Sequence, residues 1–272
     1  MADVDVPALC GSDLCLSYHG RRVVDGGGIE LRPGRVTALI GPNGSGKSTL
    51  LRALARLHRP DSGRIQLADG TSALDLPAKR FAREVTLLAQ SRPTPSGVTV
   101  GDVVGYGRHP YRSRWRASDP DGARATAWAM EVTGVKGMAG RPVDELSGGE
   151  LQRVWLATCL AQDTGVLLLD EPTTFLDLRY QVEILDLVRD LADQHGVAVG
   201  VVLHDLNQAA ALADHLVLLS NGEVRASGPP AQVLTEHHLT ETYGIRIEVV
   251  ADSVTNRLTC WPVGRHQLAP IH

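Results

Sequence analysis

Aromatic side chains are scarce in this 272-residue sequence, in which phenylalanine, tryptophan and tyrosine together make up 4% although 43% of the residues are hydrophobic. The core must therefore be built mainly from valine, leucine, alanine and isoleucine, which suits helices packed on a buried parallel sheet. We expect an α/β fold, arranged as one large domain or two small ones.

An excess of positive charge is also lacking. The formal net charge is -4 and the sequence pI is about 6.2, which disfavours nucleic acid and anionic membrane surfaces as partners because both select basic proteins. No apolar run reaches the roughly 18 residues of a membrane span, and the N-terminus "MADVDVPALCGSD" carries acids where a signal peptide has basic residues. We expect a soluble, intracellular protein whose membrane role, if it has one, comes through a partner.

The cysteines and histidines show no metal-ligand spacing. None of the cysteines forms a CxxC pair, which predicts reduced cytosolic thiols; they are Cys10, Cys15, Cys159 and Cys260. The histidines toward the C-terminus are not compactly spaced, so a surface role is favoured over metal binding; they are His237, His238, His266 and His272.

A glycine-rich loop, "GPNGSGKST" at 41–49, follows the strand-like run "RVTALI" (35–40) and runs into "STLLRALARL" (48–57), which has helical spacing. It fills the pattern GxxxxGK[ST], in which backbone N–H groups and the helix dipole bind phosphates, the lysine reaches the β- and γ-phosphates, and the hydroxyl ligates Mg²⁺. A simple glycine turn is the alternative. The candidate phosphate-binding residues are Gly41, Pro42, Asn43, Gly44, Ser45, Gly46, Lys47, Ser48 and Thr49.

A second segment, "TGVLLLDEPTTFLD" (164–177), begins as a buried parallel strand and ends in two acids. Carboxylates at the C-terminal edge of such a strand emerge where α/β sheets bind ligands. Asp170 is placed to hold Mg²⁺, directly or through water, and Glu171 to orient or deprotonate an attacking water. An ordinary turn after the strand is the alternative.

A third segment, "ELSGGELQRVWLATCLAQ" (145–162), places Ser147, Gly148 and Gly149 ahead of an amphipathic helix, with Ser147 as the N-cap. Taken by itself, this segment is an ordinary helix N-cap. It is nevertheless a second helix N-terminus able to bind anions, and two such termini with one phosphate loop indicate a nucleotide held between two chains.

Together these motifs resemble the ATP-binding subunits of ABC transporters, from about Leu14 to about Tyr243. "GPNGSGKST" is similar to the Walker A loop, "LSGGE" to the signature sequence, "VLLLDEP" to the Walker B strand and "TTFLD" to the D-loop. The resemblance assigns Glu150 and Asp177 as further candidates. It also assigns the Q-loop glutamine Gln90, the switch histidine His204 and the adenine-stacking Tyr18, and for each of these three a purely structural role is the alternative.

The resemblance implies a single ABC ATPase domain over 1–272. Its P-loop NTPase (RecA-like) core would span about 12–95 and 161–245, with an N-terminal antiparallel β region, an inserted α-helical subdomain at about 96–160 and a tail at about 246–272. The expected ligands are ATP and Mg²⁺, in a head-to-tail dimer that drives permease subunits. The resemblance implies that catalysis falls to Glu171, His204, Gln90 and Lys47, and the metal to Ser48, Gln90 and Asp170.

The stretch "GYGRHPY" (105–111), with "TTFLD", resembles the ATPases of type II importers for iron siderophores, haem and cobalamin. We favour a ferric siderophore, with haem or cobalamin as alternatives, which implies an extracytoplasmic binding protein and a place at the cytoplasmic face of the membrane. The basic loop here could bind nucleic acid, but a solvated loop or contact with a membrane partner fits the acidic pI better; it comprises Arg108, Tyr111, Arg112, Arg114, Trp115 and Arg116.

One segment departs from the family pattern. Gly26, Gly27 and Gly28 stand in a stretch that leads into a strand, and glycine weakens a strand, so the sequence leaves the local order near the adenine side open. Two other functions remain open: a soluble, non-transport ABC ATPase, which usually needs tandem cassettes or a long coiled coil, and an inactive scaffold, against which the intact Lys47 and Glu171 argue.

Overall fold

The computed structural model describes residues 6–90, 92–112 and 119–264. A six-stranded sheet forms its centre, in the order β5-β6-β7-β3-β8-β9, and only β9 runs antiparallel to its neighbour. Its strands are Val36–Ile40 (β3), Val85–Leu88 (β5), Val166–Asp170 (β6), Ala198–Val202 (β7), His215–Ser220 (β8) and Glu223–Gly228 (β9). The α/β fold expected from the sequence is confirmed.

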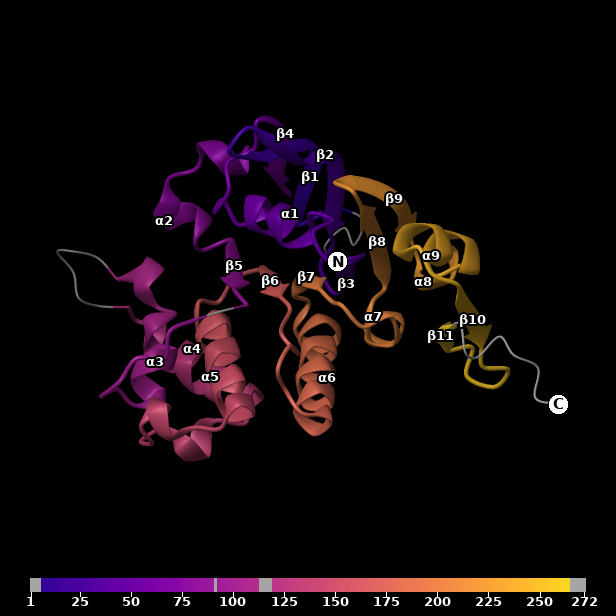
Figure 1. Cartoon of the computed structure of the whole chain (residues 1–272). Coiled ribbons are helices and arrows are strands. Elements are labelled where there is room, and N and C mark those ends of the chain that lie inside the picture. Colours follow the sequence, from indigo (N-terminus) through magenta and orange to yellow (C-terminus); the bar gives the residue numbers. More distant parts are fainter. Residues whose placement is uncertain (1–5, 91, 113–118, 265–272) are drawn as a thin grey trace.

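A three-stranded antiparallel sheet, ordered β2-β1-β4, packs over one side of the central sheet (Figure 1). Its strands are Leu9–Tyr18 (β1), Arg21–Leu31 (β2) and Ser62–Leu67 (β4). Strand β2 continues through its three glycines, a point that the sequence left open. Gly26 has φ of +65°, and the register with β1 shifts from Leu14–Gly27 to Leu16–Val24; glycine here accommodates a β-bulge.

Alternate side chains of the central strands point to the two faces of the sheet. In β6, Leu167 and Leu169 belong to one apolar cluster, and Val166 and Leu168 to the other. Helices cover both faces, which is why these strands read as continuous apolar runs. Helix α1 (Lys47–Leu54) packs in the cluster with β1 and β2, whereas α5 (Gly148–Ala161) and α6 (Leu178–His195) pack in the other.

Between β5 and β6 the described elements are helices, in agreement with the absence of a strand pattern there, and they gather beside the sheet (Figure 1). They are α3 (Val100–Tyr106), η2 (His109–Tyr111), α4 (Gly122–Val132), η3 (Lys136–Met138), η4 (Val143–Glu145) and α5. A capping box at Thr99 and Asp102 starts α3. Two short elements precede β5: η1 (Ala73–Asp75) and α2 (Ala78–Phe81).

After β7 come α7 (Leu206–Leu212), β8, β9, α8 (Pro230–Val233), α9 (Glu236–Tyr243) and a hairpin of β10 (Ile247–Ala251) and β11 (Leu258–Pro262). The hairpin contacts α7, where Cys260 N donates to Asn207 Oδ1 at 2.7 Å. None of the helices in the described part of the chain combines the length and apolarity needed to cross a membrane. His266 and His272 lie outside the described residues.

Candidate active site

The glycine-rich loop joins the end of β3 to the start of α1, as its sequence predicts. Gly46, the N-cap of α1, has φ of +103°, and a Cβ there would lie 2.9 Å from the carbonyl oxygen of Val23, so only glycine fits. No side chain caps α1. The first N–H groups of this helix, together with its dipole, therefore face the loop as donors for an anion.

Lys47 is 4% exposed, and its ammonium donates to the carbonyl oxygens of Gly41 and Pro42, both at 2.9 Å. Burial lowers the pKa of Lys47, and the nearby carboxylates of Glu171 and Asp170 oppose that shift. Ser45 is 1% exposed, and its Oγ has no hydrogen-bond partner among the described residues. A buried hydroxyl without a partner is costly, so it indicates that the loop is completed by a polar ligand.

Asp170 ends β6, and its buried carboxylate faces the first turn of α1. Ser48 Oγ donates to Asp170 Oδ1 at 2.7 Å, and Arg52 lies 3.3 Å from Oδ2. The sequence predicted that Ser48 and Asp170 would share a metal, and the structure brings them together. A hydroxyl and a carboxylate are oxygen donors of the kind that Mg²⁺ prefers.

Glu171, the next residue, is the meeting point of three loops. Its Oε2 accepts from Gln90 Nε2 at 2.5 Å and from Thr174 Oγ1 at 3.1 Å, and its Oε1 lies 2.6 Å from His204 Nε2. Gln90 follows β5 and His204 follows β7, the strands on either side of β6. Parallel strands end at one edge of a sheet, which is why residues distant in sequence converge on one carboxylate.

The signature segment begins α5 with a reciprocal capping box. Ser147 Oγ accepts from Glu150 N, and Glu150 Oε2 accepts from Ser147 N at 2.9 Å. These hydrogen bonds from Ser147 lower the pKa of Glu150. Because α5 and α1 cover opposite faces of the central sheet (Figure 1), the structure does not bring Ser147, Gly148 and Gly149 into the loop that starts α1.

Two further candidates lie at the borders of the site. Asp177 caps α6, with its Oδ1 accepting from Tyr180 N at 3.0 Å, and the neighbouring Phe175 is 97% exposed. Tyr18 ends β1, is 40% exposed and packs its ring against His58, with 4.4 Å between ring centroids. Its ring is thus accessible for stacking. Asn43 and Gly44 are exposed, and Thr49 is half-buried in α1.

Comparison with known proteins identifies the family. The model of the family described as "ABC transporter" matches residues 24–174, more than half of the chain and including both the glycine-rich loop and Asp170–Glu171. The chain belongs to the ABC transporter family. It is accordingly an ATP-binding, ATP-hydrolysing subunit that works with a membrane permease and as paired ATPase cassettes.

Curated ABC relatives match almost end to end. The ferric enterobactin transport ATP-binding protein FepC of Escherichia coli (strain K12) is 41% identical over 263 residues, which cover 96% of each chain. The hemin import ATP-binding protein HmuV of Thermobifida fusca (strain YX) is 43% identical over 252 residues, which cover 92% of this chain and 87% of that protein.

Among solved ABC structures, an inward-facing conformation of a transporter assigned to the metal-chelate type superposes with a TM-score of 0.83. It is 26% identical and covers 96% of this chain and 100% of that one. The P-loop NTPase core with an antiparallel β region, expected from the sequence, is confirmed as the ABC ATPase fold.

Arg108 differs from the sequence interpretation, which placed it in an exposed, partner-contacting loop. The side chain is 4% exposed: Nε and one terminal nitrogen donate to the Asp119 carboxylate at 2.7 and 2.9 Å, and the other donates to the Ala161 carbonyl at 3.0 Å. It also lies over the Tyr111 ring, 3.8 Å from the centroid. A guanidinium so enclosed is a structural cross-link, so the assignment of Arg108 to docking is wrong.

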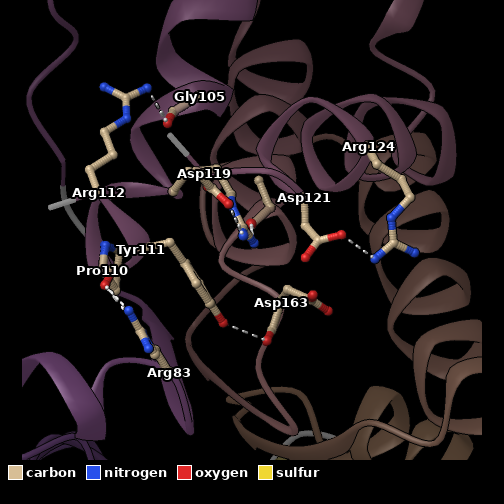
Figure 2. A network of polar contacts seen from close by, with 11 residues as sticks. Arg83, Gly105, Pro110, Tyr111, Arg112, Asp119, Asp121, Arg124 and Asp163 are labelled. Atoms are coloured by element: carbon tan, nitrogen blue, oxygen red, sulfur yellow. Dashed lines mark hydrogen bonds and ion pairs between the residues drawn. The ribbon is translucent and has the colours of Figure 1, made fainter. Parts of the chain in front are cut away.

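Tyr111 belongs to the same cluster (Figure 2). Arg83 lies 4.7 Å from the centroid of its ring and also donates to the Pro110 carbonyl, while the Tyr111 hydroxyl donates to the Asp163 carbonyl at 3.3 Å. In the stretch 105–112 the exposed side chains are instead those of Tyr106, His109 and Arg112. Arg114, Trp115 and Arg116 lie outside the described residues.

Two residues that contact the acids were missed by the sequence interpretation. Arg52 reaches Asp170, and Thr174 donates to Glu171. Their spacing offered a signal: Arg52 stands one helical turn after Ser48 on α1, and Thr174 follows Glu171 by three residues in the turn that leaves β6.

Proposed function

We propose that this ABC ATPase powers an importer of ferric siderophores and hydrolyses Mg-ATP at the residues described above. The convergence of Gln90, Glu171 and His204 beside the Ser48–Asp170 pair carries the proposal. It places an acid that can act on water next to a loop built for phosphates. A folded ABC-like scaffold without activity would have no need to keep this set together.

The phosphates of ATP fit the glycine-rich loop, where the uncapped N-terminus of α1, the ammonium of Lys47 and the unpartnered Ser45 Oγ supply donors. Ser48 and Asp170 would hold Mg²⁺, which would neutralise phosphate charge. Tyr18 offers its exposed ring to adenine. Gln90, also a metal candidate from the sequence, donates its amide N–H to Glu171, and its oxygen remains available as a ligand.

The chemistry of hydrolysis then falls to Glu171 and its neighbours. The carboxylate can orient an attacking water and take its proton. His204 Nε2 donates a hydrogen bond to Glu171 Oε1, which fixes the orientation of the carboxylate. Gln90 holds the other oxygen. The roles of all three depend on the loops that follow adjacent strands.

Two copies in a head-to-tail dimer would complete each site. The signature residues Ser147, Gly148, Gly149 and Glu150 begin α5, which packs on the opposite face of the sheet from α1, so a partner's signature segment, with Asp177 nearby, is needed over each ATP. The experiment mixes Lys47→Ala with Ser147→Arg. Each homodimer lacks a working site, whereas the mixed dimer has one intact site, and ATP-driven crosslinking should recover above either variant alone. Crosslinking no higher than in the single variants would overturn this arrangement.

The transported substrate is supported by relatives named for ferric enterobactin and hemin transport. We propose a ferric siderophore, with haem as the second candidate, delivered by an extracytoplasmic binding protein to a permease on whose cytoplasmic face this subunit sits. The test is ATP-dependent uptake into vesicles that contain the permease and this subunit, with the binding protein supplied. Uptake of a ferric siderophore but not haem is expected. The reverse would favour haem, and loss of uptake with Glu171→Gln is the control.

A further inference from the structure

The second glycine of the signature segment is covered by an aromatic ring of its own chain. A Cβ on Gly149 would fall far inside van der Waals contact of Cγ, Cδ1 and Cδ2 of Tyr180, so the ring of Tyr180 lies against the glycine backbone. Gly149 is buried. At Gly148, one position earlier, an added Cβ meets nothing within 4 Å. The chain itself therefore requires glycine at one position and tolerates a side chain at the other.

Tyr180 is itself held by the D-loop. Its backbone N–H donates to Asp177 Oδ1 at 3.0 Å, in the first turn of α6. The guanidinium of Arg153 lies 5.5 Å from the centroid of the ring, and Arg153 pairs with Glu183 at 2.6 Å. The ring thus joins the first turn of α6, which Asp177 of the D-loop caps, to α5.

A third contact joins the same two regions. Gln152 Nε2 donates to the carbonyl oxygen of Pro172 at 2.9 Å. Gly149, Gln152 and Arg153 are spaced three and four residues apart and share one face of α5. Through Gln152, this face of α5 contacts the segment that begins with Glu171 and ends with Asp177. Through Gly149, at the N-terminus of α5, the same face contacts Tyr180.

We propose that Tyr180 is a positioning residue that fixes the signature segment of a chain to the D-loop of the same chain. This inference rests on the proposed head-to-tail dimer, in which the signature segment serves the partner's ATP while Glu171 serves the chain's own. Through Tyr180, the two sites are held in one geometry: the signature N-terminus cannot turn or shift without moving the D-loop.

The first experiment measures ATP-driven dimerisation in a Glu171→Gln background, which holds ATP without turnover. Tyr180→Ala should weaken this dimerisation about tenfold, within the usual range of coupling between sites, while ATP binding by the monomer stays unchanged because no part of the phosphate loop is altered. Tyr180→Phe keeps the ring and should retain dimerisation. In the parent background, Tyr180→Ala should lower the Hill coefficient for ATP; an unchanged Hill coefficient and dimer affinity would overturn the proposal.

The second experiment is a double-mutant cycle that separates steric fit from loss of fold. Gly149→Ala should impair dimerisation because its Cβ meets the ring, and Tyr180→Ala in the same chain should restore part of the loss. Gly148→Ala should show no such rescue, because its Cβ meets no part of Tyr180. Equal thermal stability of all variants excludes a folding explanation, and absence of rescue at Gly149 would contradict the assigned contact.

The head-to-tail dimer and the positioning role of Tyr180 are distinguished by different outcomes. If Glu171→Gln alone remains a monomer with Mg-ATP, the proposed dimer is wrong. If it dimerises and the Tyr180 variants behave as the parent, only the positioning role is wrong.

Discussion

Two polar clusters in this chain each contain a carboxylate but differ in their role. Around Arg108, the guanidinium contacts among the described residues are with the Asp119 carboxylate, the Ala161 carbonyl and the Tyr111 ring, and the side chain is only 4% exposed. Around Glu171, the contacts come from three loops, and His204 remains 41% exposed. A permanently charged group that is enclosed and fully paired serves structure, whereas titratable groups that reach solvent from separate loops can serve chemistry.

The two clusters also differ in what they join. The Arg108 cluster links the η2 turn to the segment before α4 through Asp119, to the end of α5 through Ala161 and to the segment before β5 through Arg83. It therefore ties the inserted helices to the central sheet. The Glu171 cluster joins the ends of β5, β6 and β7 at a single carboxylate, and changes there should affect turnover more than folding.

The largest expected effect follows from Glu171→Gln. The amide keeps the size of the side chain but cannot take a proton, so steady-state ATP hydrolysis should fall by about a hundredfold or more. ATP should still bind and hold the dimer, which gel filtration with Mg-ATP would show. Asp170→Asn is the matched variant and should weaken Mg²⁺-dependent ATP binding itself. Hydrolysis equal to the parent would remove Glu171 as the residue that activates water.

Arg108→Ala should act on stability instead. It leaves the Asp119 carboxylate largely buried and without its partner, which costs about 3 kcal/mol of unfolding free energy, the lower end for broken buried pairs. Urea unfolding monitored by circular dichroism would measure it. The ATPase of the folded fraction should remain, since Arg108 is not in the nucleotide site. A stable variant that has lost ATPase would reverse the comparison between the two clusters.

The stability effect of Arg108 should depend on pH. The hydrogen bonds from Arg108 lower the pKa of Asp119 below its ordinary value of 3.8. A carboxylate with a depressed folded-state pKa contributes stability above the unfolded value, and this contribution is lost as pH falls through the folded value. The difference in unfolding free energy between the parent and Arg108→Ala should therefore be constant near neutral pH and shrink below about pH 4. A difference that grows on acidification would contradict the pair.

The smallest expected effect is at Arg124, which pairs with Asp121 close to the Arg108 cluster (Figure 2). Both side chains are well exposed, at 79% and 59%, and the contact is 3.1 Å. Exposed pairs of this kind contribute little. Arg124→Ala should change the unfolding free energy by less than about 0.5 kcal/mol in the same urea experiment. A loss comparable to that of Arg108→Ala would show that burial does not distinguish these two ion pairs.

The local motifs were predictable because each depends on neighbours in sequence. The loop at 41–49 needs glycines where φ is positive and a helix that starts at Lys47, and its glycines and the helical spacing that follows them predict both. The run "VLLLD" needs only to be buried on both faces, which its continuous apolar residues predict. The capping box formed by Ser147 and Glu150 likewise spans only four consecutive residues. The sequence also predicted the α/β class and the helical nature of the segment between β5 and β6.

Tertiary structure alone decided which side chains of distant segments meet. Strand order places the ends of β5 and β7 beside β6, so that Gln90 and His204 reach Glu171, and no spacing in the sequence gives these distances. It also buried Arg108, which reads as part of a solvated basic loop until Asp119 and Ala161 are brought to it. The contact of Tyr180 with Gly149 has the same origin. Local conformation follows from the covalent neighbours of a residue, whereas burial and pairing of charges depend on packing between elements far apart in the chain.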